Sequence, residues 1–219
     1  MDKKSVFVSM GFPYTEPQKE FRAALHDLLR SCGVEPRIMN YTDFPKGNPA
    51  KDVSAVMGQC HGVVVVAFER TYFESGIEKK QQEALKSIRY TTPWNQIEAA
   101  MALALKLPIF VLIEPGLRQE GLIDRGFDWY LDQISISAAG LSDQGVRSRI
   151  MAWCRDVGST TAPDERKIDE NMTVGALLRM LTLKTGAAAI ALGIGILGTG
   201  ILIGQNPTVA AFFLKLIGK

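Results

Sequence analysis

A run of seven residues without a polar side chain, residues 62–68 (GVVVVAF), most constrains the fold of this 219-residue chain. Its four consecutive valines favour a β-strand, and an uninterrupted apolar strand is typical of a parallel sheet that is buried on both faces. Three further segments, mostly apolar, predict strands: residues 6–9, 36–39 and 108–113. Between the strands lie segments with the periodicity or composition of helices: residues 17–32, about 52–60 and 96–107.

Strands that alternate with helices predict an α/β fold. Right-handed crossovers between parallel strands place helices on both faces of the sheet, so we expect a flavodoxin-like open parallel sheet. In such sheets ligands bind beyond the carboxyl ends of the strands. The residues that follow each strand are therefore candidates for a functional site.

One candidate segment, residues 94–98 (WNQIE), opens an Ala-rich helix. Thr91 and Thr92 are available to cap this helix, so Glu98 falls in its first turn or just past it. The amide dipoles at that end favour the ionised carboxylate, and Trp94, about one turn earlier, is placed to wall one side of a pocket. A lone W-x-x-x-E spacing by itself favours a solvated acid beside a Trp that packs on the sheet, and the surrounding strands and helices are what favour a functional site.

The order of these segments resembles a Toll/interleukin-1 receptor (TIR) domain over roughly residues 4–135. The resemblance is carried by the 6–9 strand, the loop at 43–47 (DFPKG), the 62–68 strand, a turn that contains Ser75 and the W-x-x-x-E spacing. In that family the loop after the second strand typically carries an acidic residue, a Pro and a Gly. Asp43, Pro45 and Gly47 match this pattern, which implies a loop that contacts neighbouring domains or gates the pocket. Glu98 falls where the enzymatic members keep their catalytic glutamate.

The chain departs from the TIR pattern between Ser75 and Trp94. There it inserts a polar run, residues 76–92, which we interpret as a solvated helix in preference to a mobile lid. The segment from Glu98 through residues 108–112 (PIFVL) is equally similar to nucleoside 2-deoxyribosyltransferases, in which a glutamate attacks the sugar. Both families break an N-glycosidic bond at C1 of a ribose, so the resemblance implies that reaction class.

This reaction needs a carboxylate and little else. Release of nicotinamide from NAD passes through an oxocarbenium-like centre, which Glu98 would stabilise or capture. The chain has neither a G-x-G-x-x-G nor a P-loop sequence, so NAD is expected as a substrate and not as a cofactor. Its three cysteines show no paired ligand spacing, and no metal is expected. A net charge of +2 gives no argument for nucleic-acid binding.

The substrate contacts expected from the loops are aromatic and basic. Phe12, Tyr14 and Trp94 are candidates to stack on a ring, and Phe44 to close over it, although ordinary packing is an equal alternative. Positive charges for phosphate are expected from three residues near the carboxyl ends of the strands: Lys46, Arg70 and Arg118.

Residues 185–204 (TGAAAIALGIGILGTGILIG) run for 20 residues without a charge, enough for one helical crossing of a bilayer. Small residues on one face of this span predict contacts between spans, at Ala189, Gly193, Gly200 and Gly204. The predicted division of the chain is a TIR-like domain at 1–158, a polar linker at 159–171, a juxtamembrane helix at 172–184, the span, and a short amphipathic tail at 205–219. With no N-terminal signal sequence, we expect a single-pass C-terminal anchor in the bacterial inner membrane and a cytoplasmic domain.

These expectations combine into a membrane-anchored TIR-like effector that hydrolyses NAD or a related nucleotide. The resemblance implies activation by self-assembly into a homo-oligomer, a role in bacterial anti-phage defence, and an upstream nucleotide signal or sensor protein as a further partner. Two alternatives stay open. One is a nucleotide sensor that does not cleave its ligand and whose membrane segment oligomerises and permeabilises the membrane. The other is a protein-interaction adaptor.

Overall fold

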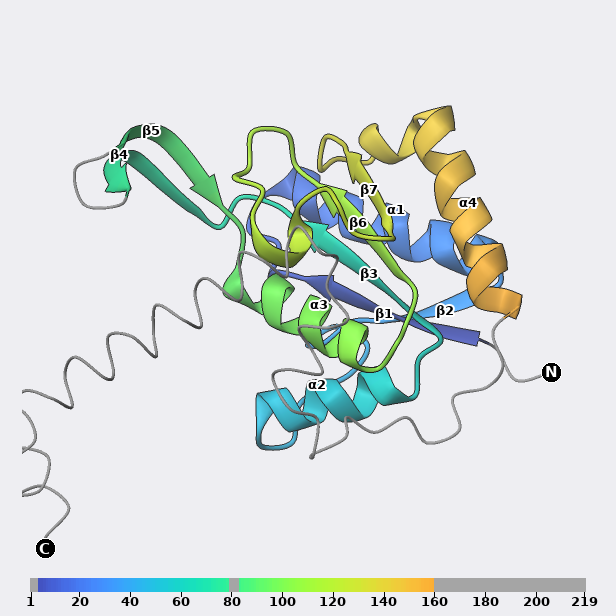
Figure 1. Ribbon diagram of the computed structural model, residues 1–219. Coiled ribbons are helices and arrows are strands. Elements are labelled where there is room, and N and C mark those ends of the chain that lie inside the picture. The colour runs from blue at the N-terminus through green and yellow to red at the C-terminus, as the bar shows by residue number, and fades with distance from the viewer. Residues whose placement is uncertain (1–3, 79–82, 160–219) are drawn as a thin grey trace, which may run out of the picture. The chain divides into compact units, whose positions relative to one another are not determined.

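The computed structural model describes residues 4–78 and 83–159, which fold into a parallel sheet between two layers of helices (Figure 1). In chain order the strands are β1 (Lys4–Met10), β2 (Val34–Arg37), β3 (Gly62–Ala67), β4 (Thr71–Glu78), β5 (Glu83–Tyr90), β6 (Ile109–Ile113) and β7 (Tyr130–Gln133). The helices are α1 (Glu16–Ser31), α2 (Pro49–Gly58), α3 (Pro93–Ala104) and α4 (Gln144–Ser159), with two short 3-10 helices, η1 (Gly121–Ile123) and η2 (Gly140–Ser142). The strands and helices expected from the sequence up to residue 113, apart from the inserted segment, are present, with ends displaced by up to three residues.

Five strands form the central sheet in the order β2-β1-β3-β6-β7, and every neighbouring pair is parallel. After β1 the chain crosses to the edge strand β2 and then returns to β3 on the other side of β1. The strand order therefore reverses between β1 and β3, as it does in flavodoxin-like sheets. The predicted α/β class with a parallel sheet flanked by helices is confirmed.

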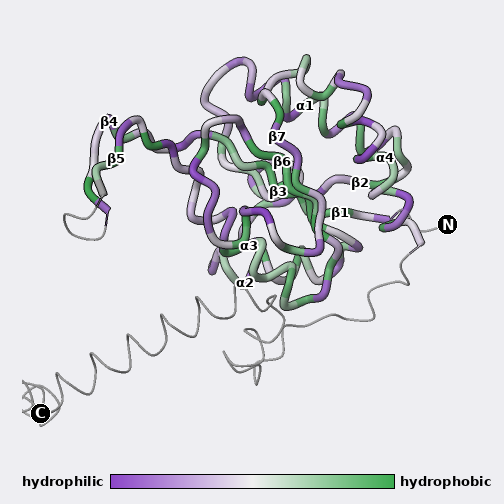
Figure 2. Tube along the Cα trace, turned by 45° about the horizontal axis from the view of Figure 1, so that its top comes forward, coloured by the Kyte–Doolittle hydropathy of each residue, from purple (hydrophilic) through white to green (hydrophobic). Residues whose placement is uncertain are grey.

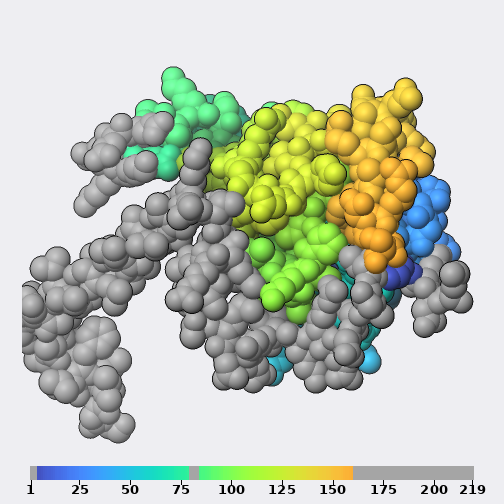
Figure 3. Space-filling model, turned by 45° about the vertical axis from the view of Figure 1, so that its right-hand side comes forward, coloured from blue at the N-terminus to red at the C-terminus, as the bar shows by residue number. Residues whose placement is uncertain are grey.

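The alternation of side chains along β3 produces two cores from one run of valines. Val64 and Val66 pack with residues of α1 and α4, whereas Val63 and Val65 pack with residues of α2 and α3 on the opposite face. Figure 2 shows the central strands β3 and β6 in green between helices of mixed colour, and Figure 3 shows α4 (orange) beside α1 (blue). Coverage on both faces explains why no polar residue interrupts this strand.

The expected solvated helix at residues 76–92 is wrong. β4 and β5 pair antiparallel as a separate two-stranded sheet, which projects from the domain after β3 (Figure 1). In their register Phe73 lies opposite Ile88, and the rings of Phe73 and Tyr90 meet edge to face at 6.1 Å. The helix interpretation rested on the density of charges in this segment. Its apolar residues have a spacing of two only at Ile88 and Tyr90, so the local pattern does not specify the hairpin.

The predicted linker, juxtamembrane helix, span and tail fall almost entirely in residues 160–219, outside the described residues. The same is true of the predicted contacts at Ala189, Gly193, Gly200 and Gly204. In the part of the chain that the structure describes, no helix is both long enough and apolar enough to cross a membrane.

Candidate functional site

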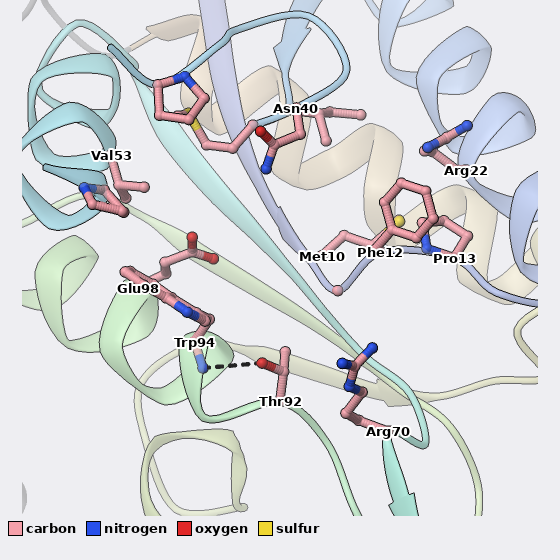
Figure 4. Close-up of a pocket in the computed structure, with 15 residues that line it drawn as sticks. Met10, Phe12, Pro13, Arg22, Asn40, Val53, Arg70, Thr92, Trp94 and Glu98 are labelled. Atoms are coloured by element: carbon pink, nitrogen blue, oxygen red, sulfur yellow. Dashed lines mark hydrogen bonds between the residues drawn. The ribbon is translucent and has the colours of Figure 1, made fainter. Parts of the chain in front are cut away.

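A cavity of ≈ 410 Å³ opens at the carboxyl ends of β1 and β3, where the strand order reverses (Figure 4). It is lined by the loop after β1, Arg22 of α1, the loop after β2, the start of α2, Arg70 after β3, and the first turns of α3. The lining residues are Met10, Gly11, Phe12, Pro13, Arg22, Ile38, Met39, Asn40, Pro45, Pro49, Val53, Arg70, Thr92, Trp94 and Glu98. Ligands of open α/β sheets bind at this reversal of strand order.

Helix α3 presents Glu98 to this cavity. Thr92 caps the helix by accepting a hydrogen bond from the Trp94 amide at 3.3 Å, and Pro93 occupies the first helical position. Glu98 is therefore the sixth residue of α3 and lies just past the first turn. Its neighbours Ala99 and Ala102 are fully buried against the sheet, and such small side chains let the helix approach closely. The carboxylate points away from α3 toward the cavity (Figure 4).

Burial dominates the electrostatics of Glu98. The residue is only 7% exposed, and the loss of hydration raises its pKa to about 7, although a hydrogen bond from Ser9 opposes the shift. The sequence argument expected the helix amides to favour the ionised form. The loss of hydration is the largest contribution at this position, so the net pKa is raised. A carboxyl group with a pKa about 7 is poised between its two protonation states at neutral pH.

The expected aromatic contacts divide into two groups. Phe12 and Trp94 line the cavity, and both keep exposed ring surface, 72% and 38% of the residue. Tyr14 and Phe44 are absent from the lining. The Tyr14 hydroxyl donates to the Glu69 carbonyl at 2.9 Å, and Phe44 is 69% exposed on the loop after β2.

Only one of the three expected cations lies in the cavity wall. Arg70 lines it, at the exit from β3. Lys46 uses its backbone amide to bond Asp52, and its side chain is not part of the wall. Arg118 forms ion pairs with Glu78 at 2.8 Å and Glu120 at 2.9 Å, outside the cavity.

The structure adds Arg22, which sequence reasoning missed. This α1 residue lines the cavity, and its guanidinium lies over the ring of Tyr41, with 4.2 Å from Cζ to the ring centroid. Its Nε is buried and has no hydrogen-bond partner among the described residues. A buried N–H without a partner costs free energy. Arg22 follows the buried Phe21 in an amphipathic helix, and nothing in that pattern separates it from an ordinary surface arginine.

The loop at residues 43–47 is held by internal bonds. Arg37 donates to the carboxylate of Asp43, and its Nε lies at 3.1 Å. Burial acts to raise the pKa of Asp43, but the bonds from Arg37 and Thr42 outweigh it and leave the pKa lowered. Pro45 lines the cavity, and the Gly47 amide donates to Asp52 at 3.0 Å. The loop is thus anchored at both ends and contributes one residue to the site.

No family model matches this chain, and no curated protein does. Among solved structures, the chain is similar to the metal-soaked Flv1 flavodiiron core from Synechocystis sp. PCC6803, with 10% identity over 71% of this chain and 36% of that one and a TM-score of 0.43. It is also similar to a diflavin flavoprotein A3 from Nostoc sp., with 12% identity over 81% of this chain and 84% of that one and a TM-score of 0.28. The chain therefore spans little more than a third of the flavodiiron core, 36% of its length.

Proposed function

We propose that this chain cleaves the N-glycosidic bond of NAD or a related nucleotide, with Glu98 as the catalytic carboxylate. The observation that carries the proposal is the placement of Glu98, a buried carboxyl group at the wall of an open cavity where the strand order reverses. Burial makes its charge expensive in the empty site. A positive charge that develops beside the carboxylate in the transition state offsets this cost. The interaction is absent in the ground state, so it lowers the barrier of the reaction.

In the proposed reaction the bond between C1 of the ribose and the nicotinamide nitrogen breaks, and its electron pair goes to the nitrogen. Nicotinamide leaves as a neutral molecule, and the positive charge moves to the C1–O centre of the ribose. The Glu98 carboxylate stabilises this charge or bonds to C1. Water then adds to C1 and loses one proton to solvent; where Glu98 has bonded to C1, that bond breaks in this step and its electron pair returns to the carboxylate. Glu98 must be ionised, so activity is expected to rise with pH through about 7, the pKa of this group.

The rest of the cavity supports a charged, ring-bearing substrate. Trp94 and Phe12 offer exposed ring faces to a base or nicotinamide. Arg22 and Arg70 bring two guanidinium groups to the same cavity, and Glu98 is the only acid among the described residues that line it. Guanidinium groups bind phosphate oxygens in pairs of hydrogen bonds, so these residues are the proposed phosphate contacts.

The wider role follows the resemblance to TIR domains. We propose a TIR-like domain that works as a homo-oligomer, tethered to the bacterial inner membrane by the span at residues 185–204 and used in anti-phage defence. Tethering raises the local concentration of the domain and so favours assembly.

A second function is favoured by one observation. With a pKa about 7, roughly half of the Glu98 side chains are protonated at neutral pH, and a protonated carboxyl donates a hydrogen bond instead of stabilising a cation. A nucleotide sensor that binds without cleavage would use Glu98 in this way. Its membrane segment would then be the effector.

Purified full-length protein in detergent, incubated with NAD at pH 6 and at pH 8, separates the two functions. The enzyme is expected to release nicotinamide, faster at pH 8, and Glu98→Gln is expected to lose at least about a hundredfold in rate. Saturable NAD binding without release of nicotinamide at either pH would favour the sensor.

A further inference from the structure

The turn after β2 presents Asn40 to the cavity in a backbone conformation that few residues adopt. Its φ of 60° lies in the left-handed region, which glycine adopts freely and asparagine tolerates better than most residues. Asn40 is exposed and belongs to the cavity lining. Because residues in this region cluster at ligand sites, Asn40 is a candidate for substrate recognition.

Backbone hydrogen bonds hold this turn in place. The Ile38 carbonyl accepts from three backbone amides: Tyr41 at 3.2 Å, Thr42 at 2.9 Å and Asp43 at 3.1 Å. The backbone amide of Asn40 donates to the Asp43 carbonyl at 2.7 Å. The side-chain amide of Asn40 has no hydrogen-bond partner among the described residues. A fixed backbone thus presents N–H donors and an acceptor oxygen that a ligand can use.

The charges of the cavity give a bound nucleotide a direction. In Figure 4, Arg22 and Arg70 lie at one end of the cavity, and Glu98 and Trp94 lie at the other. The side chain of Asn40 points into the cavity apart from both arginines, toward the end that holds Glu98 (Figure 4). A nucleotide with its phosphates at the arginines and C1 of its ribose at Glu98 places the leaving base at this end. The adenine of a dinucleotide lies beyond the phosphates, away from Asn40.

Asn40 is equipped to pair with a base in two directions at once. Among the described residues that line the cavity, it alone carries a side-chain amide. The lining residues Pro45, Pro49 and Val53 have no polar side-chain atom, and the Thr92 hydroxyl accepts the capping bond of α3. A side-chain amide and a carboxamide form two hydrogen bonds, in which each N–H donates to the oxygen of the other.

We propose that Asn40 is a specificity-determining residue that recognises the leaving base, and that it selects a base with a carboxamide group, such as nicotinamide. This inference rests on the proposed function, which places the base beside Glu98. A base that carries only an acceptor leaves the Asn40 oxygen without a donor once the ligand has displaced water. A site built in this way discriminates against such a base. The substrate class is therefore a nucleotide whose leaving base carries a neutral carboxamide.

The test compares NAD with its acetylpyridine analogue, in which a methyl group replaces the amino group of the carboxamide. The two ligands have the same charge and nearly the same shape, so they differ in the N–H donor. Dissociation constants are measured by calorimetry on full-length Glu98→Gln in detergent, which is expected to hold either ligand uncleaved. NAD should bind about tenfold more tightly than the analogue, the effect of one hydrogen bond. Equal affinities would overturn the proposal.

Asn40→Gly in the same Glu98→Gln protein isolates the role of the side chain. Glycine adopts a φ of 60° without strain, so the turn should keep its shape. The ratio of the two affinities should fall from about tenfold to about one, because the group that tells the ligands apart is gone. A purely structural role of Asn40 would change both affinities alike. A ratio that persists in the folded variant would therefore contradict the proposal.

Asn40→Asp gives a second variant whose backbone also tolerates the left-handed region. The aspartate has the same shape, but its carboxylate has no N–H donor and faces the carbonyl oxygen that both ligands carry. Both ligands should therefore bind about tenfold more weakly or worse. If Asn40→Gly does not fold, this variant decides: an affinity for NAD equal to that of the parent protein would overturn the proposal.

Nicotinamide release by the wild-type chain tests the proposed function separately. A preference for NAD that depends on Asn40, without release of nicotinamide, would support the role of Asn40 and refute the hydrolase. Release of nicotinamide, with a preference that is unchanged in Asn40→Gly, would support the hydrolase and overturn the role of Asn40. A protein that does not bind NAD would overturn both.

Discussion

Replacing Glu98 by Gln is expected to make the folded protein more stable at alkaline pH while it removes the proposed activity. Burial raises the pKa of Glu98 to about 7 from an ordinary 4.5. An acid with a higher pKa in the folded state holds its proton more tightly when folded, so the wild-type protein loses stability as pH rises from 4.5 through 7. The glutamine side chain of the variant is neutral at every pH and escapes this loss.

The size of the effect follows from the shift. The difference between 7 and 4.5 is 2.5 units, which at about 1.36 kcal/mol per unit amounts to about 3 kcal/mol above pH 8. For a domain of this size that corresponds to a rise in Tm of about 6 °C or more. Below pH 4 both proteins are neutral at this position, and the difference should vanish.

Thermal denaturation of the two proteins at pH 4, 6 and 8, in the same detergent and salt, measures this directly. Glu74→Gln is a matched control, since Glu74 is exposed on β4, and it should change stability by less than about 0.5 kcal/mol at each pH. A stability difference for Glu98→Gln that is the same at pH 4 and pH 8 would refute the burial argument.

Three further predictions concern the cavity and its scaffold. Arg22→Gln should raise KM for NAD about tenfold or more with little change in kcat, and an unchanged KM would remove Arg22 from phosphate binding. Gly62→Ala should destabilise the fold by about 1–3 kcal/mol in chemical denaturation, because the added Cβ would lie 2.8 Å from Val157 and 2.9 Å from Trp153; wild-type stability would contradict this packing. Gly47→Val should leave stability within about 0.5 kcal/mol, since a Cβ there meets no atom within 4 Å, and should lower both oligomer formation and nicotinamide release if the loop mediates assembly.

The sheet could be predicted because its signal is local. Residues 62–68 contain four valines in sequence, and strands buried on both faces require such runs. Local signals also predict that Glu98 and Trp94 lie near the start of a helix, because a capping threonine and a proline precede them. β7 was missed, because this edge strand has no buried residue and so lacks an apolar signal.

The remaining errors come from tertiary effects. From its place near a helix start, Glu98 is expected to be ionised. Its pKa is raised because the folded chain buries it, which the local sequence does not show. Arg22 belongs to the site only because the fold brings α1 to the wall of the cavity. The helix expected at residues 76–92 follows from the charges of that segment, whereas the β4–β5 hairpin depends on the pairing of two strands, such as Phe73 opposite Ile88, which the spacing within the segment does not reveal.

The most direct test of the account is the release of nicotinamide from NAD by the full-length protein at pH 8, measured by chromatography beside Glu98→Gln at the same concentration. The account predicts that nicotinamide and ADP-ribose appear in equal amounts with the wild-type protein, and that the variant is at least about a hundredfold slower although it is folded and more stable. Equal rates for the two proteins would contradict the assignment of Glu98 as the catalytic carboxylate.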